Sequence, residues 1–290
     1  MSSRVTNSLK NVKIGLIFYV VSLILTFISR RVFLNNLGAD FIGLTGTLNS
    51  ILNLLNLAEL GIGSSVSFFL YKPLERNNRK EINEIISLLG FLYHKIGFLI
   101  LITGVIVSFF LPLIFQHAEI QISIVYFAYY SFLLSSVFGY LINYRQILLI
   151  ADQKNYLVTG YLQTANILKI GLQIFLAYYY KNLYLWISVE FIFSFCSYVI
   201  LNRRIQKNYT WLKSSAGDGI SLLKKYPDIL IKTKQIFIQK IKDFILTKSD
   251  EILVFAFVSL KMVAFYGNYM IIINKLIYLV NIISDGMGAG

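Results

Sequence analysis

The sequence contains little cysteine, proline or acidic charge. Its single cysteine, Cys196, lies within an apolar segment and excludes an internal disulfide. The chain has 3 prolines in 290 residues. The longest gap between its apolar segments, from Asn202 to about Thr233, is too short for a sizeable soluble domain. No small-residue cleavage site follows the apolar run from Ile14 to Ser29, so this run is interpreted as a retained helix and not a signal peptide.

Long apolar segments are abundant. The chain is 57% hydrophobic, and a helix needs about 20 predominantly apolar residues to cross the hydrocarbon layer. The segments from Ile96 to Ala118 and from Ile120 to Tyr144 reach that length without a charge. We therefore predict an all-α integral membrane protein, a polytopic helix bundle with about eight spans. These lie near 13–34, 41–70, 85–112, 121–145, 155–179, 184–202, 235–259 and 263–285.

Basic residues collect in every second gap between these segments. They precede the first span and follow the second, fourth and sixth, whereas the gap from Gln116 to Glu119 has none. Because Lys and Arg resist translocation, this pattern predicts a cytoplasmic N-terminus. The formal charge of +13 lies largely in these short loops, which favours contact with membrane lipids and not with nucleic acid. Between Ile220 and Lys234 apolar residues alternate with lysines, which predicts an amphipathic linker on the anionic inner leaflet.

Polar side chains recur at helical spacing inside five predicted spans. They are costly in hydrocarbon unless they face protein or a watery cavity. The second span carries Asn49, Asn53, Asn56, Glu59 and Gly63 on one helix face. The other stripes are Ser22, Thr26 and Arg30 in the first span, Asn166, Lys169 and Gln173 in the fifth, Lys240, Asp243, Thr247 and Asp250 in the seventh, and Asn274, Asn281 and Asp285 in the eighth.

These stripes also have an interpretation without a ligand. Hydrogen bonds between helices, worth about 0.6 to 2 kcal/mol each, would explain the asparagines. Arg30 would then be an anchor near the outer end of its span. Lys169 would pair with Glu190, and Lys240 and Asp243 have the spacing of a local ion pair.

A weak internal repeat relates the second and eighth spans. At an offset of 225 positions, Asn49, Leu54, Asn56, Gly61 and Gly63 fall on Asn274, Leu279, Asn281, Gly286 and Gly288. Both spans cross in the same direction, as in a parallel repeat about an axis along the membrane normal. We therefore predict a first lobe of six helices at 1–202 and the amphipathic linker at 203–234. The first two helices of a second lobe, apparently truncated, follow at 235–290.

Four stretches together carry a family resemblance. The first runs from Ser29 to Leu74 as SRRVFLNNLGADFIGLTGTLNSILNLLNLAELGIGSSVSFFLYKPL, and the others cover 93–115, 144–158 and 237–276. In this order they resemble the oligosaccharide flippases known as polysaccharide biosynthesis proteins, of the multidrug/oligosaccharidyl-lipid/polysaccharide exporter superfamily. The resemblance implies a bilobed transporter of the bacterial inner membrane, with N-terminus cytoplasmic, and not an enzyme. It would flip lipid-linked oligosaccharide units on undecaprenyl pyrophosphate by alternating access.

The resemblance also implies a use for the polar stripes, because relatives line their central cavity chiefly with helices one, two, seven and eight. Asparagines would bond sugar hydroxyls, and a cation would hold the phosphates. The substrate-binding candidates are Arg30, Asn49, Asn53, Asn56, Lys169, Asn274 and Lys275. Glu59, Asp243 and Asp250 are candidates for binding a coupling ion, H⁺ or Na⁺. No metal or other cofactor is expected, and the partners implied are the lipid-linked oligosaccharide and polysaccharide polymerase or assembly proteins.

Two alternatives remain open. An acidic pocket in the first lobe would favour a multidrug exporter of the same superfamily. Here the charge of the candidate cavity in that lobe is mixed, because Arg30 and Lys169 occur together with Glu59. A membrane glycosyltransferase or polymerase commonly needs a sizeable outer loop with acidic residues, and the predicted outward gaps are only a few residues long. Both alternatives fit the sequence less well than a flippase.

Overall fold

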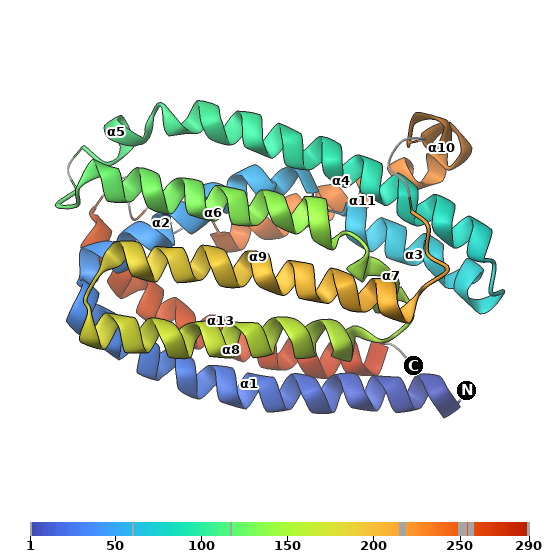
Figure 1. Cartoon of the computed structure of the whole chain (residues 1–290), viewed down its shortest axis with the longest axis horizontal. Helices are drawn as coiled ribbons and strands as arrows, with labels where there is room; N and C mark the ends of the chain where they lie inside the picture. The colour runs from blue at the N-terminus through green and yellow to red at the C-terminus, as the bar shows by residue number, and fades with distance from the viewer. Residues whose placement is uncertain are drawn as a thin grey trace.

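The computed structural model of this chain is a bundle of long helices that lie side by side (Figure 1). It describes residues 2–59, 61–116, 118–214, 219–248, 254 and 258–288. No strand occurs among these residues. The predicted all-α class is therefore confirmed for the described part of the chain.

The helices follow the predicted apolar segments in order. Those up to residue 208 are α1 (Ser2–Leu37), α2 (Ala39–Leu55), the 3₁₀ helix η1 (Asn56–Glu59), α3 (Ile62–Glu75), α4 (Arg79–Ser108), α5 (Leu111–Ile114), α6 (Ile122–Asn143), α7 (Gln146–Ala151), α8 (Asn155–Tyr179) and α9 (Leu183–Asn208). They are followed by α10 (Gly219–Lys225), α11 (Pro227–Lys248) and α13 (Leu260–Gly288). The predicted linker at 203–234 thus contains the end of α9, all of α10 and the first two turns of α11.

Five helices in the described part are long and apolar enough to cross a membrane: Leu9–Leu37, Arg79–Ser108, Ile122–Asn143, Leu183–Asn208 and Leu260–Asn281. Large apolar side chains point outward from them, such as Phe98 and Phe109 of the α4 segment, which are 63% and 75% exposed. Such side chains are stable when lipid surrounds them, and continuous helices satisfy their own backbone groups there. The chain is therefore a multi-pass helical membrane protein.

The second predicted span, 41–70, is interrupted. α2 ends at Leu55, η1 carries the chain to Glu59, and α3 begins at Ile62. Gly61 has a φ of 95°, a left-handed conformation that glycine adopts without a Cβ penalty. A Cβ on Gly61 would come within 3.0 Å of backbone atoms of Thr233 and Phe237 in α11. Glycine therefore allows both the break and the close approach of α11.

The four basic gaps lie at one end of the bundle (Figure 1). This end holds the start of α1, the turn between α3 and α4, α7, and the segment between α9 and α11. The opposite end holds the connections from α1 to α2, from α5 to α6 and from α8 to α9. The structure thus reproduces the alternation on which the topology prediction rests, and the cytoplasmic assignment of the basic end stays a prediction.

Side-chain hydrogen bonds join the loops at the basic end. Asn11 of α1 accepts a hydrogen bond of 2.7 Å from the backbone N–H of Tyr156. Asn83 of α4 accepts one of 2.6 Å from the backbone N–H of Lys213. The Tyr209 hydroxyl donates to Asp152 over 2.6 Å, and burial, together with this hydrogen bond, raises the pKa of Tyr209. The hydroxyl therefore stays protonated and remains a donor at neutral pH.

The last helices pack against the first ones. α13 lies along α1 and α2, and α11 packs against α3. A methyl group at Gly43 of α2 would overlap the backbone carbonyl of Leu260, the first residue of α13. Glycine at this position therefore lets the two helices touch through their backbones.

Candidate functional site

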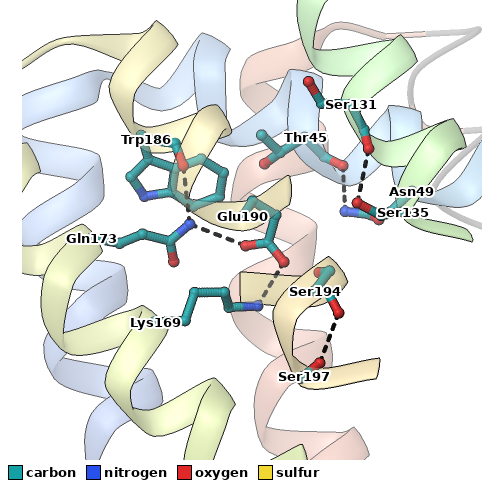
Figure 2. A network of polar contacts seen from close by, with 10 residues as sticks. All are labelled: Thr45, Asn49, Ser131, Ser135, Lys169, Gln173, Trp186, Glu190, Ser194 and Ser197. Atoms are coloured by element: carbon teal, nitrogen blue, oxygen red, sulfur yellow. Dashed lines mark hydrogen bonds and ion pairs between the residues drawn. The ribbon is translucent and has the colours of Figure 1, made fainter. Parts of the chain in front are cut away.

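Polar side chains from four helices face one another inside the bundle (Figure 2). This inner polar region is made by Thr45 and Asn49 of α2, Ser131 and Ser135 of α6, Lys169 and Gln173 of α8, and Glu190, Ser194 and Ser197 of α9. Asn49, Ser135 and Ser197 bond backbone carbonyls of their own helices. Lys169 and Gln173 of α8 bond Glu190 of α9.

The charged part of the inner polar region is an ion pair. The ammonium of Lys169 lies 2.6 Å from a carboxylate oxygen of Glu190. The side-chain amide of Gln173 donates to the other carboxylate oxygen over 3.0 Å and to the backbone carbonyl of Trp186 over 3.3 Å. Lys169 thus pairs with Glu190, which is the interpretation without a ligand that the sequence allowed. Glu190 compensates the charge of Lys169.

Two of the candidate asparagines, Asn49 of α2 and Asn56 of η1, lie beside serines of α6. Asn49 is exposed and donates to the backbone carbonyl of Thr45 over 2.8 Å. Asn53 is also exposed, and Asn56 accepts a hydrogen bond of 2.8 Å from Ser136. The polar stripes predicted from the sequence do not include these serines of the fourth predicted span. Their recurrence at 131, 135 and 136, about one helical turn apart, was the available signal.

Glu59 lies at the end of η1, at the break between α2 and α3. Its carboxylate accepts a hydrogen bond of 2.6 Å from the hydroxyl of Tyr93 in α4. The Tyr93 ring meets the Tyr140 ring of α6 edge to face, with centroids 5.5 Å apart. The break thus brings a carboxylate to the junction of three elements.

A second polar zone lies between α1 and α13, which we call the α1–α13 seam. Arg30 donates from Nε to the Asn268 side chain and from a terminal nitrogen to the Ala264 carbonyl, each over 2.6 Å. Lys275 donates to the Ser22 hydroxyl over 2.7 Å. Arg31, the next residue of α1, is exposed. Arg30 therefore turns toward α13, which a lipid-facing anchor would not do.

The remaining candidates are less informative. Asn274 is exposed on α13. Asp243 belongs to α11, but its side chain lies outside the described part of the structure. The whole of Asp250 lies outside the described residues.

An aromatic groove of about 820 Å³ runs between α6 and α9. Tyr126, Phe127 and Tyr130 line it from α6, and Phe191 and Ile192 line it from α9. Ser131 belongs both to this groove and to the inner polar region. Aromatic walls thus continue into a zone of hydroxyl and amide groups.

No protein-family model, no curated protein and no solved structure matches the chain.

Proposed function

We propose that this protein is a flippase for lipid-linked oligosaccharides. It carries units on undecaprenyl pyrophosphate from the inner to the outer leaflet of a bacterial inner membrane by alternating access. In this proposal α1 to α9 form the first lobe and α11 and α13 begin the second. The chain then crosses the membrane about eight times, with its N-terminus and all basic loops in the cytoplasm.

The observation that carries the proposal is the α1–α13 seam. A cation inside the hydrocarbon layer is costly, up to about 2.5 to 3.5 kcal/mol at the centre on lenient scales, and such groups face protein or a cavity. Arg30 and Lys275 both lie between helices of the two proposed lobes, with oxygen atoms as their partners. In the proposed mechanism, an anion that enters between the lobes meets these two positive charges.

Guanidinium geometry suits the pyrophosphate of the substrate. Its planar fork binds phosphate oxygens with two parallel hydrogen bonds and stays charged. The Asn268 oxygen and the Ala264 carbonyl are neutral acceptors. A phosphate can replace these two acceptors, because its charge-assisted hydrogen bonds with the guanidinium are stronger. This replacement would release α13 from Arg30. Substrate binding would thereby loosen the contact between the lobes.

The sugar and the lipid tail need different surroundings. The asparagines of α2 and the serines of α6 offer exchangeable hydrogen bonds for sugar hydroxyls, and the polyprenyl chain stays in lipid beside the bundle. No chemical bond of the substrate changes in this process, so the proposal assigns the protein no catalytic step. Polysaccharide polymerase or assembly proteins would take up the flipped unit.

Substitutions at Arg30 test the proposal. Arg30→Ala should abolish glycan export per molecule of protein, and Arg30→Lys should retain part of it because the charge survives without the bidentate geometry. Arg31→Ala is the matched control and should be mild. Asn268→Ala, which removes one of the acceptors that α13 offers to Arg30, should keep phosphate binding. Export is measured as surface glycan normalised to the protein in the membrane.

The lipids of a deletion strain provide the second arm. Loss of the protein should leave lipid-linked sugar units in the cytoplasmic leaflet and reduce surface glycan. Unchanged surface glycan with new sensitivity to cationic drugs would instead favour the multidrug exporter. An Arg30→Ala protein with normal export per molecule would refute the phosphate-binding role.

A further inference from the structure

The chain between α9 and α11 crosses the basic end of the bundle and lies on α4 (Figure 1). Its described parts are 209–214 and 219–226, which we call the linker strap. A connection between two helices can move with either of them. The contacts of the linker strap decide which of its neighbours it follows.

Asn83 of α4 holds the first part of the strap by its backbone. Its side-chain oxygen accepts from the Lys213 N–H over 2.6 Å, and its amide nitrogen donates to the Trp211 carbonyl over 3.4 Å. The guanidinium of Arg79, also in α4, lies 5.5 Å from the centre of the Trp211 ring. One side chain of α4 thus bonds both a donor and an acceptor of the strap backbone.

Two further residues of α1 to α9 and their connections bind the same part of the strap. Arg145, next to the first residue of α7, donates from Nε to the Ser214 hydroxyl over 2.9 Å. Asp152, directly after α7, accepts from the Tyr209 hydroxyl over 2.6 Å. Both contacts join the strap to the proposed first lobe.

Glu84 of α4 holds the second part of the strap. One carboxylate oxygen lies 2.6 Å from the Lys225 ammonium and accepts from the Tyr226 hydroxyl over 2.5 Å. Hydrogen bonds to an ionised carboxylate are stronger than those between neutral groups. A Cβ on Gly219 would overlap the Phe91 side chain, so glycine lets α10 lie directly on α4.

The helical hydrogen bonding stops between the strap and α11. The Tyr226 N–H donates to the Leu222 carbonyl over 2.9 Å, and α10 ends there. Pro227, the first residue of α11, has no N–H with which to continue that helix. Proline suits the first position of a new helix for the same reason. The backbone between Tyr226 and Pro227 is therefore a joint, with one side bonded to Glu84.

The start of α11 rests on α3 through a contact that can part. The Ser65 hydroxyl of α3 donates to the Ile229 carbonyl over 3.0 Å. This carbonyl also accepts from the Thr233 hydroxyl over 2.7 Å, so it keeps a partner when Ser65 moves away. Lifting the strap from α4 would instead separate the charges of Glu84 and Lys225.

We propose that the linker strap is a fixed part of the first lobe and that α11 turns about the Tyr226–Pro227 joint. The strap stays on α4 through Asn83 and Glu84 while α11 leaves α3 or returns to it. Because Tyr226 is bonded to Glu84, α11 can tilt at its start but cannot slide along α4. The fixed strap does not depend on the proposed flippase. Within that function, the joint is the place where the lobes pivot at the basic end.

Distances between spin labels in the purified protein in lipid test which contact parts. In a background with Cys196 replaced by alanine, a label at Ile106 of α4 is paired with one at Ile220 of the strap or Ile238 of α11. All three positions are exposed. Ser65→Phe places a ring between α3 and α11, so the 106–238 distance should shift and the 106–220 distance should not. Equal shifts of both distances, or an unchanged 106–238 distance, would overturn the proposal.

Hydrogen exchange tests the hold on the strap and does not require Ser65→Phe to fold. Asn83→Ala removes the acceptor of the Lys213 N–H, so exchange of that amide should be about tenfold faster. Exchange in α11 should stay the same. Lys80→Ala, at an exposed position of α4, is the control and should change neither. Unchanged exchange at Lys213 in Asn83→Ala, or equally faster exchange throughout α11, would contradict the fixed strap.

A disulfide across the contact separates this proposal from the flippase. A Cβ on Gly219 would lie 2.5 Å from the Phe91 Cβ, so Phe91→Cys with Gly219→Cys brings two thiols together. The oxidised protein should export as much glycan as the reduced one, because the strap does not leave α4. Export lost on oxidation and regained on reduction would refute the fixed strap alone. A protein that exports no glycan in any form, with label distances and exchange as expected, would refute the flippase and leave the strap standing.

Discussion

At the scale of single residues, the partner of each membrane-embedded charge limits what that charge can do. Lys169 has Glu190 at 2.6 Å, and Glu190 has Gln173 on its other oxygen. Arg30 has neutral acceptors that an anion can displace. Of the two cations, Arg30 is the better candidate for holding phosphate. A phosphate that displaces the Asn268 oxygen or the Ala264 carbonyl replaces a neutral acceptor with a charged one, whereas a phosphate that displaces Glu190 from Lys169 leaves that carboxylate unpaired.

Substitutions of the Lys169–Glu190 pair test this distinction. Lys169→Met leaves Glu190 without its cation and should lower the free energy of unfolding by about 3 to 5 kcal/mol. The double variant Lys169→Met with Glu190→Gln carries no unpaired charge and should recover most of this loss. Stability is measured by denaturant unfolding in detergent. Export that stays lost in the stable double variant would return Lys169 to the substrate site.

At the scale of elements, glycines decide where helices end. Gly38 separates α1 from α2 with a φ of 91°, and a Cβ there would meet no atom within 4 Å. Any penalty for alanine at this turn is therefore conformational and not steric. Gly160, inside α8, also has open space around it, but its φ is not in the left-handed range.

The two glycines form a matched pair. Gly38→Ala should destabilise the protein by about 1 to 3 kcal/mol because the backbone must hold a conformation that alanine rarely adopts. Gly160→Ala should stabilise it by about 0.5 to 1 kcal/mol because alanine loses less entropy in a helix. Both changes are followed by thermal unfolding in detergent. Equal effects of the two substitutions would argue against the turn at Gly38.

At the scale of the whole molecule, the ends of the bundle differ in charge. The basic loops lie together at one end (Figure 1). Lys and Arg at this density favour the cytoplasmic side and the anionic lipids of the inner leaflet. Every connection at this end should therefore be protected from reagents outside the cell.

Single cysteines in a background without Cys196 test the orientation. Glu75 ends α3 at the basic end, and Glu119 precedes α6 at the opposite end, and both are exposed. A membrane-impermeant thiol reagent applied to intact cells should label Glu119→Cys and leave Glu75→Cys unlabelled. Permeabilised cells should show labelling of both, which controls for reactivity. Strong labelling of Glu75→Cys in intact cells would reverse the topology.

The sequence by itself determined the helical membrane class and the alternation of basic and non-basic loops along the chain, whereas the count of about eight spans stays a prediction. These follow from hydropathy summed over about 20 neighbouring residues and from the charge of short loops, both of which are local. Only the tertiary structure decided that α2 ends at Leu55 and α3 begins at Ile62, where side-chain and backbone contacts with α4 and α11 lie. It also decided that Arg30 meets Asn268, 238 residues away. A charge pattern along one helix gives the face on which a residue lies, whereas its partner is set by which distant helix packs on that face.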